Sequence, residues 1–187
     1  MTTEQTPQTE PGAIEPDTKD WTWVLDRPCP ECGFTAAAVD TGALAAALRD
    51  NADYWTAALA DPRAEQRPSP TVWSPTEYAC HVRDVHLVFV GRLERMLTED
   101  DPVFANWDQD ETALADRYDL QRAAEVAPAL AAAAARAAAV YESVAGDAWE
   151  RPGRRSNGSA FTVATLGRYH LHDVVHHRWD TQWMMEG

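Results

Sequence analysis

A seven-residue apolar repeat runs through the alanine-rich segment that ends near Ala145. Its members follow one another at spacings of 4, 3, 4, 3 and 4, and they are Val126, Leu130, Ala133, Ala137, Val140 and Val144. That spacing is typical of helices that pack side by side in bundles. Pro128 costs about 3 kcal/mol inside a helix, so the helix is expected to begin near it or to kink there. A chain with this segment needs further helices to cover the repeat.

Three other segments show helical periodicity. Residues 41–59 place Leu44, Leu48, Trp55 and Leu59 on one face. A second helix is expected from Pro75 to about residue 97, with an apolar face formed by Tyr78, Val82, Val85, Phe89 and Met96. The last helix is expected to begin after Thr162 and to continue into the C-terminal region. No segment alternates with period two, so the sequence predicts an all-α four-helix bundle, with no sheet beyond a short hairpin.

The start of the second helix is the most sharply defined boundary in the chain. Ser74 is the expected N-cap, Pro75 occupies the first helical position, and Glu77 completes a capping box. Trp73 and Tyr78 flank this start with the spacing of a hydrophobic staple.

Outside the bundle, 40–187, the sequence has two N-terminal parts and one long connection. Residues 1–19 contain three prolines and almost no aliphatic side chains, so this tail is expected to be disordered. Residues 20–39 are aromatic and rich in turns, and we expect a strap anchored on the bundle by Trp21 and Trp23. The connection between the second and third helices is acidic and long enough to cover a site, with Phe104 and Trp107 holding it to the bundle.

Charge narrows the range of partners. The formal net charge is −14, which disfavours nucleic acids and anionic membrane surfaces because both require a basic surface.

No apolar run is expected to approach the roughly 20 residues that span a bilayer, and no secretory signal is visible, so a cytoplasmic location is expected. Three cysteines are too few for a disulfide scaffold of this size.

The six histidines fall on only two of the predicted helices. His81 and His86 lie on the second helix, and the last helix carries His170, His172, His176 and His177. A helical projection places His172 and His176 on one arc with Tyr169, Trp179 and Trp183, and these aromatic residues are taken to mark the buried face. With His81 on the inward edge of the second helix, the pattern predicts a metal site of His81, His172 and His176. Three protein ligands would leave positions open for water or substrate.

Two alternatives remain open for the histidines. Each could instead be a hydrogen-bonded core residue. The adjacent pair His176 and His177 also leaves the register uncertain, because Asp173 and His177 could be the ligands from the last helix. His86 and His170 are expected at the surface or behind the ligands.

Two further motifs carry possible chemistry. Cys29 and Cys32 form a CxxC pair that could be inert, redox-active or metal-binding, but a structural zinc site needs four ligands and the chain has no second CxxC. Arg154 and Arg155 precede the last helix and could hold the carboxylate of a thiol cofactor or substrate. They could equally lie in solvent or pair with the acidic connection.

Two stretches resemble the DinB/YfiT-like superfamily. The second-helix signature of that family is similar to the stretch WSPTEYACHVRDVHLVFVGRL, and its last-helix HxxxH signature is similar to HDVVHHRWD. The resemblance covers roughly residues 40–185. The resemblance implies a four-helix bundle that binds a divalent metal through three histidines, or two histidines and a carboxylate. The family ligands map onto His81, His172 and His176. The extra His170 and His177 depart from the pattern, and the CPECG segment lies outside it.

The resemblance also implies a class of activity, since relatives include mycothiol-dependent maleylpyruvate isomerase and thiol S-transferases. We therefore expect a divalent-metal-dependent enzyme that uses a metal-activated, mycothiol-like small thiol for transfer or isomerisation on a small electrophile. The alternatives are a hydrolase that uses metal-bound water and a non-catalytic, stress-related metal-binding protein. Zn, Ni and Fe are not distinguished by these ligands. Relatives and the alanine-rich face together predict a homodimer.

Overall fold

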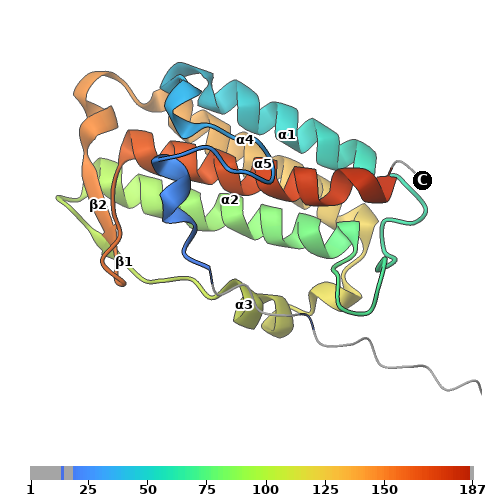
Figure 1. The fold of residues 1–187 in the computed structure, drawn as a ribbon. Coiled ribbons are helices and arrows are strands. Elements are labelled where there is room, and N and C mark those ends of the chain that lie inside the picture. The colour runs from blue at the N-terminus through green and yellow to red at the C-terminus, as the bar shows by residue number, and fades with distance from the viewer. Residues whose placement is uncertain (1–13, 15–18, 186–187) are drawn as a thin grey trace, which may run out of the picture.

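Four long helices form the body of the protein. The structure is a computed structural model that describes Ile14 and residues 19–185. The bundle consists of α1 (Leu44–Ala58), α2 (Pro75–Thr98), α4 (Ala123–Ser143) and α5 (Val163–Met185). α1 and α2 each pack against both α4 and α5 (Figure 1). The predicted four-helix bundle is confirmed. The tail predicted to be disordered lies outside the described residues, except for Ile14 and Lys19.

The helix starts agree with the capping signals in the sequence. At α2, the Glu77 amide donates to Ser74 Oγ at 3.2 Å, and the Ser74 amide donates to Glu77 Oε2 at 2.9 Å. The rings of Trp73 and Tyr78 lie 5.4 Å apart, as the staple requires. At α5, the Thr165 amide donates to Thr162 Oγ1 at 3.2 Å. Local hydrogen bonding therefore determines where these two helices begin.

The alanine-rich helix carries its seven-residue repeat into the core. Five of the six repeat residues are buried, and Val140 is partly buried. α4 begins at Ala123, five residues before Pro128, which agrees with the expected start near the proline, and it continues through Pro128. Because Pro128 is exposed and near the helix start, the missing N–H costs one bond of the first turns. α4 is long and apolar enough to cross a membrane, although the sequence was expected to contain no apolar run of that length. The apolar repeat of α4 packs against α1 and α2, as it does in a core helix.

The acidic connection has more structure than the sequence predicted. It contains the strand β1 (Val103–Phe104) and the short helix α3 (Gln109–Ala115). β1 pairs in parallel with β2 (Pro152–Arg155), which forms an antiparallel hairpin with β3 (Ala160–Thr162). The sequence predicted no sheet beyond a hairpin, and this is wrong. The three strands form a small sheet at one end of the bundle (Figure 1). β1 and α3 are too short for the two-residue period of a strand or the 3.6-residue period of a helix to be recognised in the sequence.

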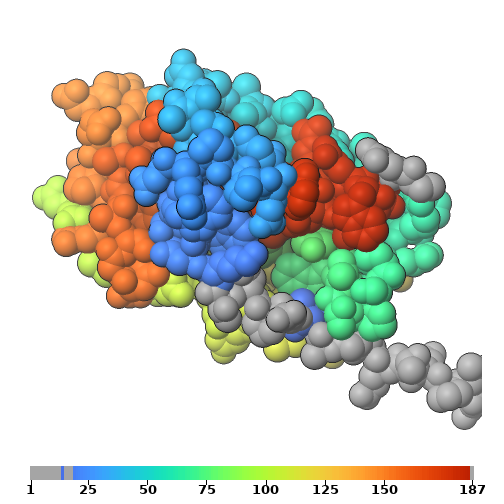
Figure 2. Space-filling model, in the orientation of Figure 1, coloured from blue at the N-terminus to red at the C-terminus, as the bar shows by residue number. Residues whose placement is uncertain are grey.

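The strap, residues 20–39, lies across α5. Its 3₁₀ helix η1 (Trp21–Leu25) packs against α5, and Trp21 and Trp23 are both partly buried against the core. Figure 2 shows these N-terminal residues, in blue, beside the red end of α5 and the orange β2 region. One face of α5 is thus covered by the strap, although in the sequence the two segments lie more than a hundred residues apart.

Candidate metal centre

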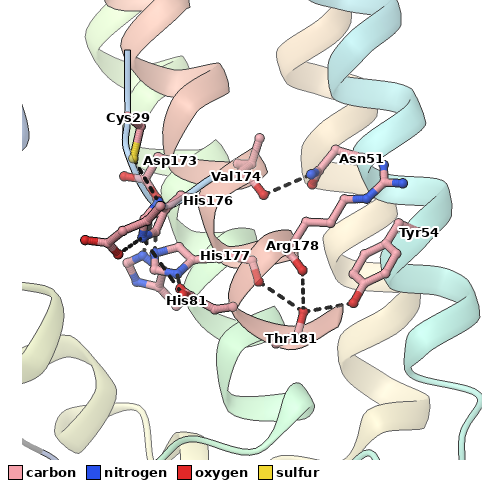
Figure 3. A network of polar contacts seen from close by, with 12 residues as sticks. Cys29, Asn51, Tyr54, His81, Asp173, Val174, His176, His177, Arg178 and Thr181 are labelled. Atoms are coloured by element: carbon pink, nitrogen blue, oxygen red, sulfur yellow. Dashed lines mark hydrogen bonds and ion pairs between the residues drawn. The ribbon is translucent and has the colours of Figure 1, made fainter. Parts of the chain in front are cut away.

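Three potential metal ligands meet where α2 faces α5. His81 Nε2 lies 3.5 Å from Asp173 Oδ1, and His177 Nε2 lies 3.5 Å from the same oxygen. The rings of His81 and His177 are 4.5 Å apart and nearly perpendicular. One ligand atom from each of the three residues lies within 4.8 Å of the others (Figure 3). We call His81, Asp173 and His177 the inner group.

The polar atoms of the inner group fit a cation better than they fit one another. Among the described residues, neither ring nitrogen of the fully buried His81 has a hydrogen-bond partner, and the same is true of Asp173 Oδ1. Buried polar atoms are rarely left unpaired. Burial lowers the pKa of His81, while the neighbouring histidines hold the pKa of Asp173 below its usual range despite its burial. At neutral pH the group therefore presents a neutral imidazole and a carboxylate, which is the state that binds a divalent metal.

Trp107 and Asp180 hold the inner group from two sides. The ring of Trp107, from the acidic connection, stacks on His81 with a centroid distance of 5.4 Å and an interplanar angle of 8°. Asp180 Oδ2 lies 2.9 Å from His177 Nδ1. A carboxylate at Nδ1 orients the ring and leaves Nε2 for a metal. The acidic connection thus covers the site, as its length suggested.

A second set of potential ligands lies between the strap and α5. Cys29, Cys32, His172 and His176 each offer one ligand atom within 4.8 Å of the others. Cys29 Sγ is 3.7 Å from His176 Nδ1. We call these four residues the strap group.

The structure therefore divides the predicted triad between two groups. It brings His81 to Asp173 and His177, the alternative register, and places His172 and His176 against the strap cysteines. The projection took Trp179 and Trp183 as markers of the buried face, and this is wrong, because they are 42% and 59% exposed. The arc of His172 and His176 is covered by the strap, which a projection of α5 alone could not represent.

The two remaining histidines form a pair in the core. His86 and His170 are fully buried, and His86 Nδ1 lies 2.9 Å from His170 Nε2. Tyr141 Oη is 3.3 Å from the other ring nitrogen of His170. The expected surface position of these residues is wrong, because each ring finds its partner inside the bundle. This pair belongs to neither ligand group.

A cavity of about 950 Å³ opens beside both ligand groups. Asp173, His172, His176 and His177 line it, together with residues of the acidic connection and the strap. Of the two predicted arginines, Arg155 lines this cavity, whereas Arg154 forms an ion pair with Asp101 of the acidic connection. The two residues alternate along β2 and so point to different surroundings.

Arg155 and Arg92 supply positive charge to the cavity wall. The Arg155 guanidinium lies 5.5 Å from the rings of Phe161 and Tyr169, and its buried Nε has no hydrogen-bond partner among the described residues. Burial and the nearby Arg155 lower the pKa of Arg92 to about 10, so Arg92 stays charged at neutral pH. Arg92 was missed from the sequence, although an arginine between Phe89 and Met96 on an apolar helix was an available signal.

The fold and the inner group together define a four-helix bundle with a candidate metal centre between two of its helices. The chain belongs to the DinB superfamily, whose sequence pattern matches residues 14–180. The solved structure of YfiT from Bacillus subtilis resembles it with a TM-score of 0.66 and 16% sequence identity. That similarity covers 77% of this chain and 87% of YfiT, which is described as a probable metal-dependent hydrolase with an unusual four-helix bundle topology. No curated protein matches the chain.

Proposed function

We propose that this protein is a metal-dependent enzyme whose divalent ion is held by His81, Asp173 and His177. The observation that carries the proposal is the inner group itself, in which the buried ring nitrogens of His81 and Asp173 Oδ1 have no hydrogen-bond partner among the described residues. A triad of His81, His172 and His176 is less well supported, because His172 and His176 already face the strap cysteines. The ligand set of two histidines and one carboxylate is one of the two that the family resemblance implied.

The position of the inner group favours catalysis over storage of the ion. Three protein ligands leave a coordination position open, and Asp173 and His177 line the cavity from which a small molecule could reach it. A divalent ion bound there lowers the pKa of a coordinated thiol or water, so that a nucleophile is available at neutral pH. The ring of Trp107 excludes water from one side of His81.

The cavity wall supports a small anionic thiol as the co-substrate. A volume of about 950 Å³ is at the upper end of small-molecule pockets, and it has room for more than a single water nucleophile. Arg155 and Arg92 would bind a carboxylate of the thiol or of the substrate. We therefore favour transfer or isomerisation with a low-molecular-weight thiol on a small electrophile.

Hydrolysis is the second candidate. It is favoured by the description of YfiT, whose fold this chain shares. In a hydrolase the arginines would bind the substrate instead of a thiol. A protein that only binds the metal would need neither the open ligand position nor the charged cavity wall.

Cobalt substitution tests the proposal and separates the candidates. The purified chain is loaded with Co²⁺, and its visible spectrum is followed as mycothiol or cysteine is added. Thiol transfer predicts a new thiolate-to-cobalt charge-transfer band, whereas a hydrolase predicts an unchanged spectrum with thiol and turnover of ester or amide substrates.

Substitution of the ligands tests the metal site itself. The variants His81→Ala, Asp173→Asn and His177→Ala should each lose about one ion per chain. Cys80→Ser, at a buried thiol outside both ligand groups, is the control that should keep it. Unchanged metal content in the three variants would contradict the proposal.

A further inference from the structure

The strap group has the composition of a structural zinc site. Two thiols come from the strap and two imidazoles from α5, and all four ligand atoms lie within 4.8 Å of one another. Four protein ligands of the Cys₂His₂ type are typical of zinc ions that hold a fold together, since no coordination position remains open. None of the three cysteines forms a disulfide, so both strap thiols are available.

The separation of the ligand atoms fits such an ion. Tetrahedral zinc with bonds of about 2.3 Å to sulfur and 2.0–2.1 Å to nitrogen would place a sulfur and a nitrogen ligand about 3.5 Å apart. Cys29 Sγ and His176 Nδ1 are 3.7 Å apart. A thiol is a weak hydrogen-bonding partner, so this buried contact gains far more from a shared cation than from a hydrogen bond.

The CPECGF turn presents its two thiols on one side. The Gly33 amide donates to the Cys29 carbonyl at 2.9 Å, and the Cys29 amide donates to the Phe34 carbonyl at 2.9 Å. Gly33 has a φ of +74°, a conformation in which glycine carries no steric cost. Burial raises the pKa of the Cys32 thiol to about 11, and a hydrogen bond from the Phe34 amide opposes that rise. The backbone of the strap thus already holds the geometry that two thiolate ligands require.

The α5 side of the group is equally well positioned. His172 and His176 are one helical turn apart, with ring centroids separated by 5.2 Å. Trp21 packs against both rings, and Phe34 packs edge-on against His172. His172 Nε2 is buried and has no hydrogen-bond partner among the described residues. Glu31 lies 3.4 Å from His176 Nε2, the nitrogen opposite the one that faces Cys29. Histidine ligands of metals commonly donate their second N–H to such a carboxylate.

We propose that Cys29, Cys32, His172 and His176 bind a structural zinc ion that fastens the strap to α5. The ion is separate from the one proposed for the inner group, and this inference stands whether or not the protein is an enzyme. Trp21 and Glu31 line the cavity, so the zinc ion would hold one wall of that cavity in place. A redox-active CxxC pair is the competing interpretation of the same cysteines, and it predicts a disulfide that excludes the metal.

Metal analysis of the full chain, purified with a reductant that does not chelate metals, tests the site. The wild-type protein should bind about two zinc ions per chain, and its Co²⁺ form should show thiolate-to-cobalt charge transfer before any thiol is added. Cys32→Ser and His172→Gln should each lose about one ion. Cys32→Ser should also abolish or strongly reduce the charge-transfer band. Asp173→Asn should keep the band, which separates failure of this site from failure of the inner group. Cys80→Ser is the control for loss of a thiol outside the strap group, and it should change neither the metal content nor the charge-transfer band.

Hydrogen exchange provides a second measurement that does not depend on activity. Removing zinc with a chelator should accelerate exchange of the strap amides, including Gly33, about tenfold or more, while exchange in α4 stays unchanged. Circular dichroism of each variant shows whether the bundle still folds. The inference is overturned if the reduced wild-type chain shows no charge-transfer band with cobalt, if Cys32→Ser keeps the full metal content, or if the cysteines are isolated as a disulfide that binds no metal.

Discussion

The side-chain amide of Asn51 donates a hydrogen bond to the main-chain carbonyl of Val174 at 2.9 Å. Its carbonyl oxygen accepts from Trp55 Nε1 at 3.1 Å, so the buried amide joins α1 to the middle of α5. Tyr54 makes a second contact of this kind, with its hydroxyl 2.9 Å from Thr181 Oγ1 (Figure 3). These contacts hold one face of α5 against α1. The ligand residues next to Val174 in the sequence are thereby directed away from α1, toward α2 and the strap.

Replacing Asn51 with alanine should therefore destabilise the protein. The substitution leaves the Trp55 indole N–H and the Val174 carbonyl without their partner, and a buried polar group left unpaired costs about 1–3 kcal/mol. Urea unfolding followed by circular dichroism measures the change. Arg49→Ala, two residues before Asn51 and in the exposed pair with Glu142, should leave the midpoint almost unchanged. Equal midpoints for Asn51→Ala and the wild type would show that the amide contributes nothing to the attachment of α5.

Gly167 should not tolerate alanine, although it lies in a helix. A Cβ at this position would lie 2.6 Å from Leu44 Cδ1 and 3.0 Å from Tyr141 Cε1, both in buried side chains. The gain of up to about 1 kcal/mol in helix propensity should be outweighed by an overpacking cost of about 1–3 kcal/mol. Gly91→Ala is the control, because its Cβ would meet nothing within 4 Å, and that variant should be stabilised. Thermal melting of the two variants should show shifts of opposite sign.

Stability without metal should fall as the pH is lowered below about 6.5. Burial lowers the pKa of His86 to about 4, against about 6.5 in an unfolded chain. The unfolded state then binds the proton more readily, so the contribution of His86 is complete above pH 6.5 and is lost toward pH 4, by about 3 kcal/mol. His86→Gln should flatten this dependence, as measured by urea unfolding of chelator-treated protein from pH 7 to pH 4. An unchanged slope in the variant would mean that His86 takes up its proton without opening the core.

The two arginines of β2 should differ in their effect on ligand binding. Arg155→Ala removes a cation from the cavity wall and should weaken binding of an anionic thiol about tenfold, equivalent to about 1.4 kcal/mol. Arg154→Ala removes the same charge outside the cavity and should have little effect, because Arg154 pairs with Asp101. Calorimetric titration with mycothiol compares the two variants. Equal losses in both would indicate a general effect of charge and would argue against a binding role for Arg155.

The exposed side of α4 is the proposed surface for a homodimer. Ala129, Ala132, Ala135 and Ala139 remain exposed on it, so a second copy could approach closely. The wild-type chain should sediment as a dimer, and Ala132→Glu should sediment as a monomer because two like charges would meet at a close helix contact. A monomer mass for the wild-type chain at high concentration would refute the proposal.

Much of the bundle could be predicted because its signals are local. The capping box at Ser74, the Thr162 cap and the repeat of α4 each depend on residues within a few turns of one another. β1 and α3 could not be predicted, since two-residue and seven-residue elements show no periodicity. Arg154 and Arg155 were found together in the sequence, but only the pairing of β2 separates the one that lines the cavity from the one that does not.

The sequence by itself determined the helices, the clustering of histidines on α2 and α5, and the presence of a CxxC pair. It could not decide which histidine faces which partner, because a projection of one helix shows relative angles without showing what covers each side. The tertiary structure decided this. Contacts with α1 set the rotation of α5, α2 brings His81 to Asp173 and His177, and the strap brings Cys29 and Cys32 to His172 and His176. The sequence lacked a second CxxC for a zinc site, and the fold supplies the two missing ligands from residues about 140 positions away.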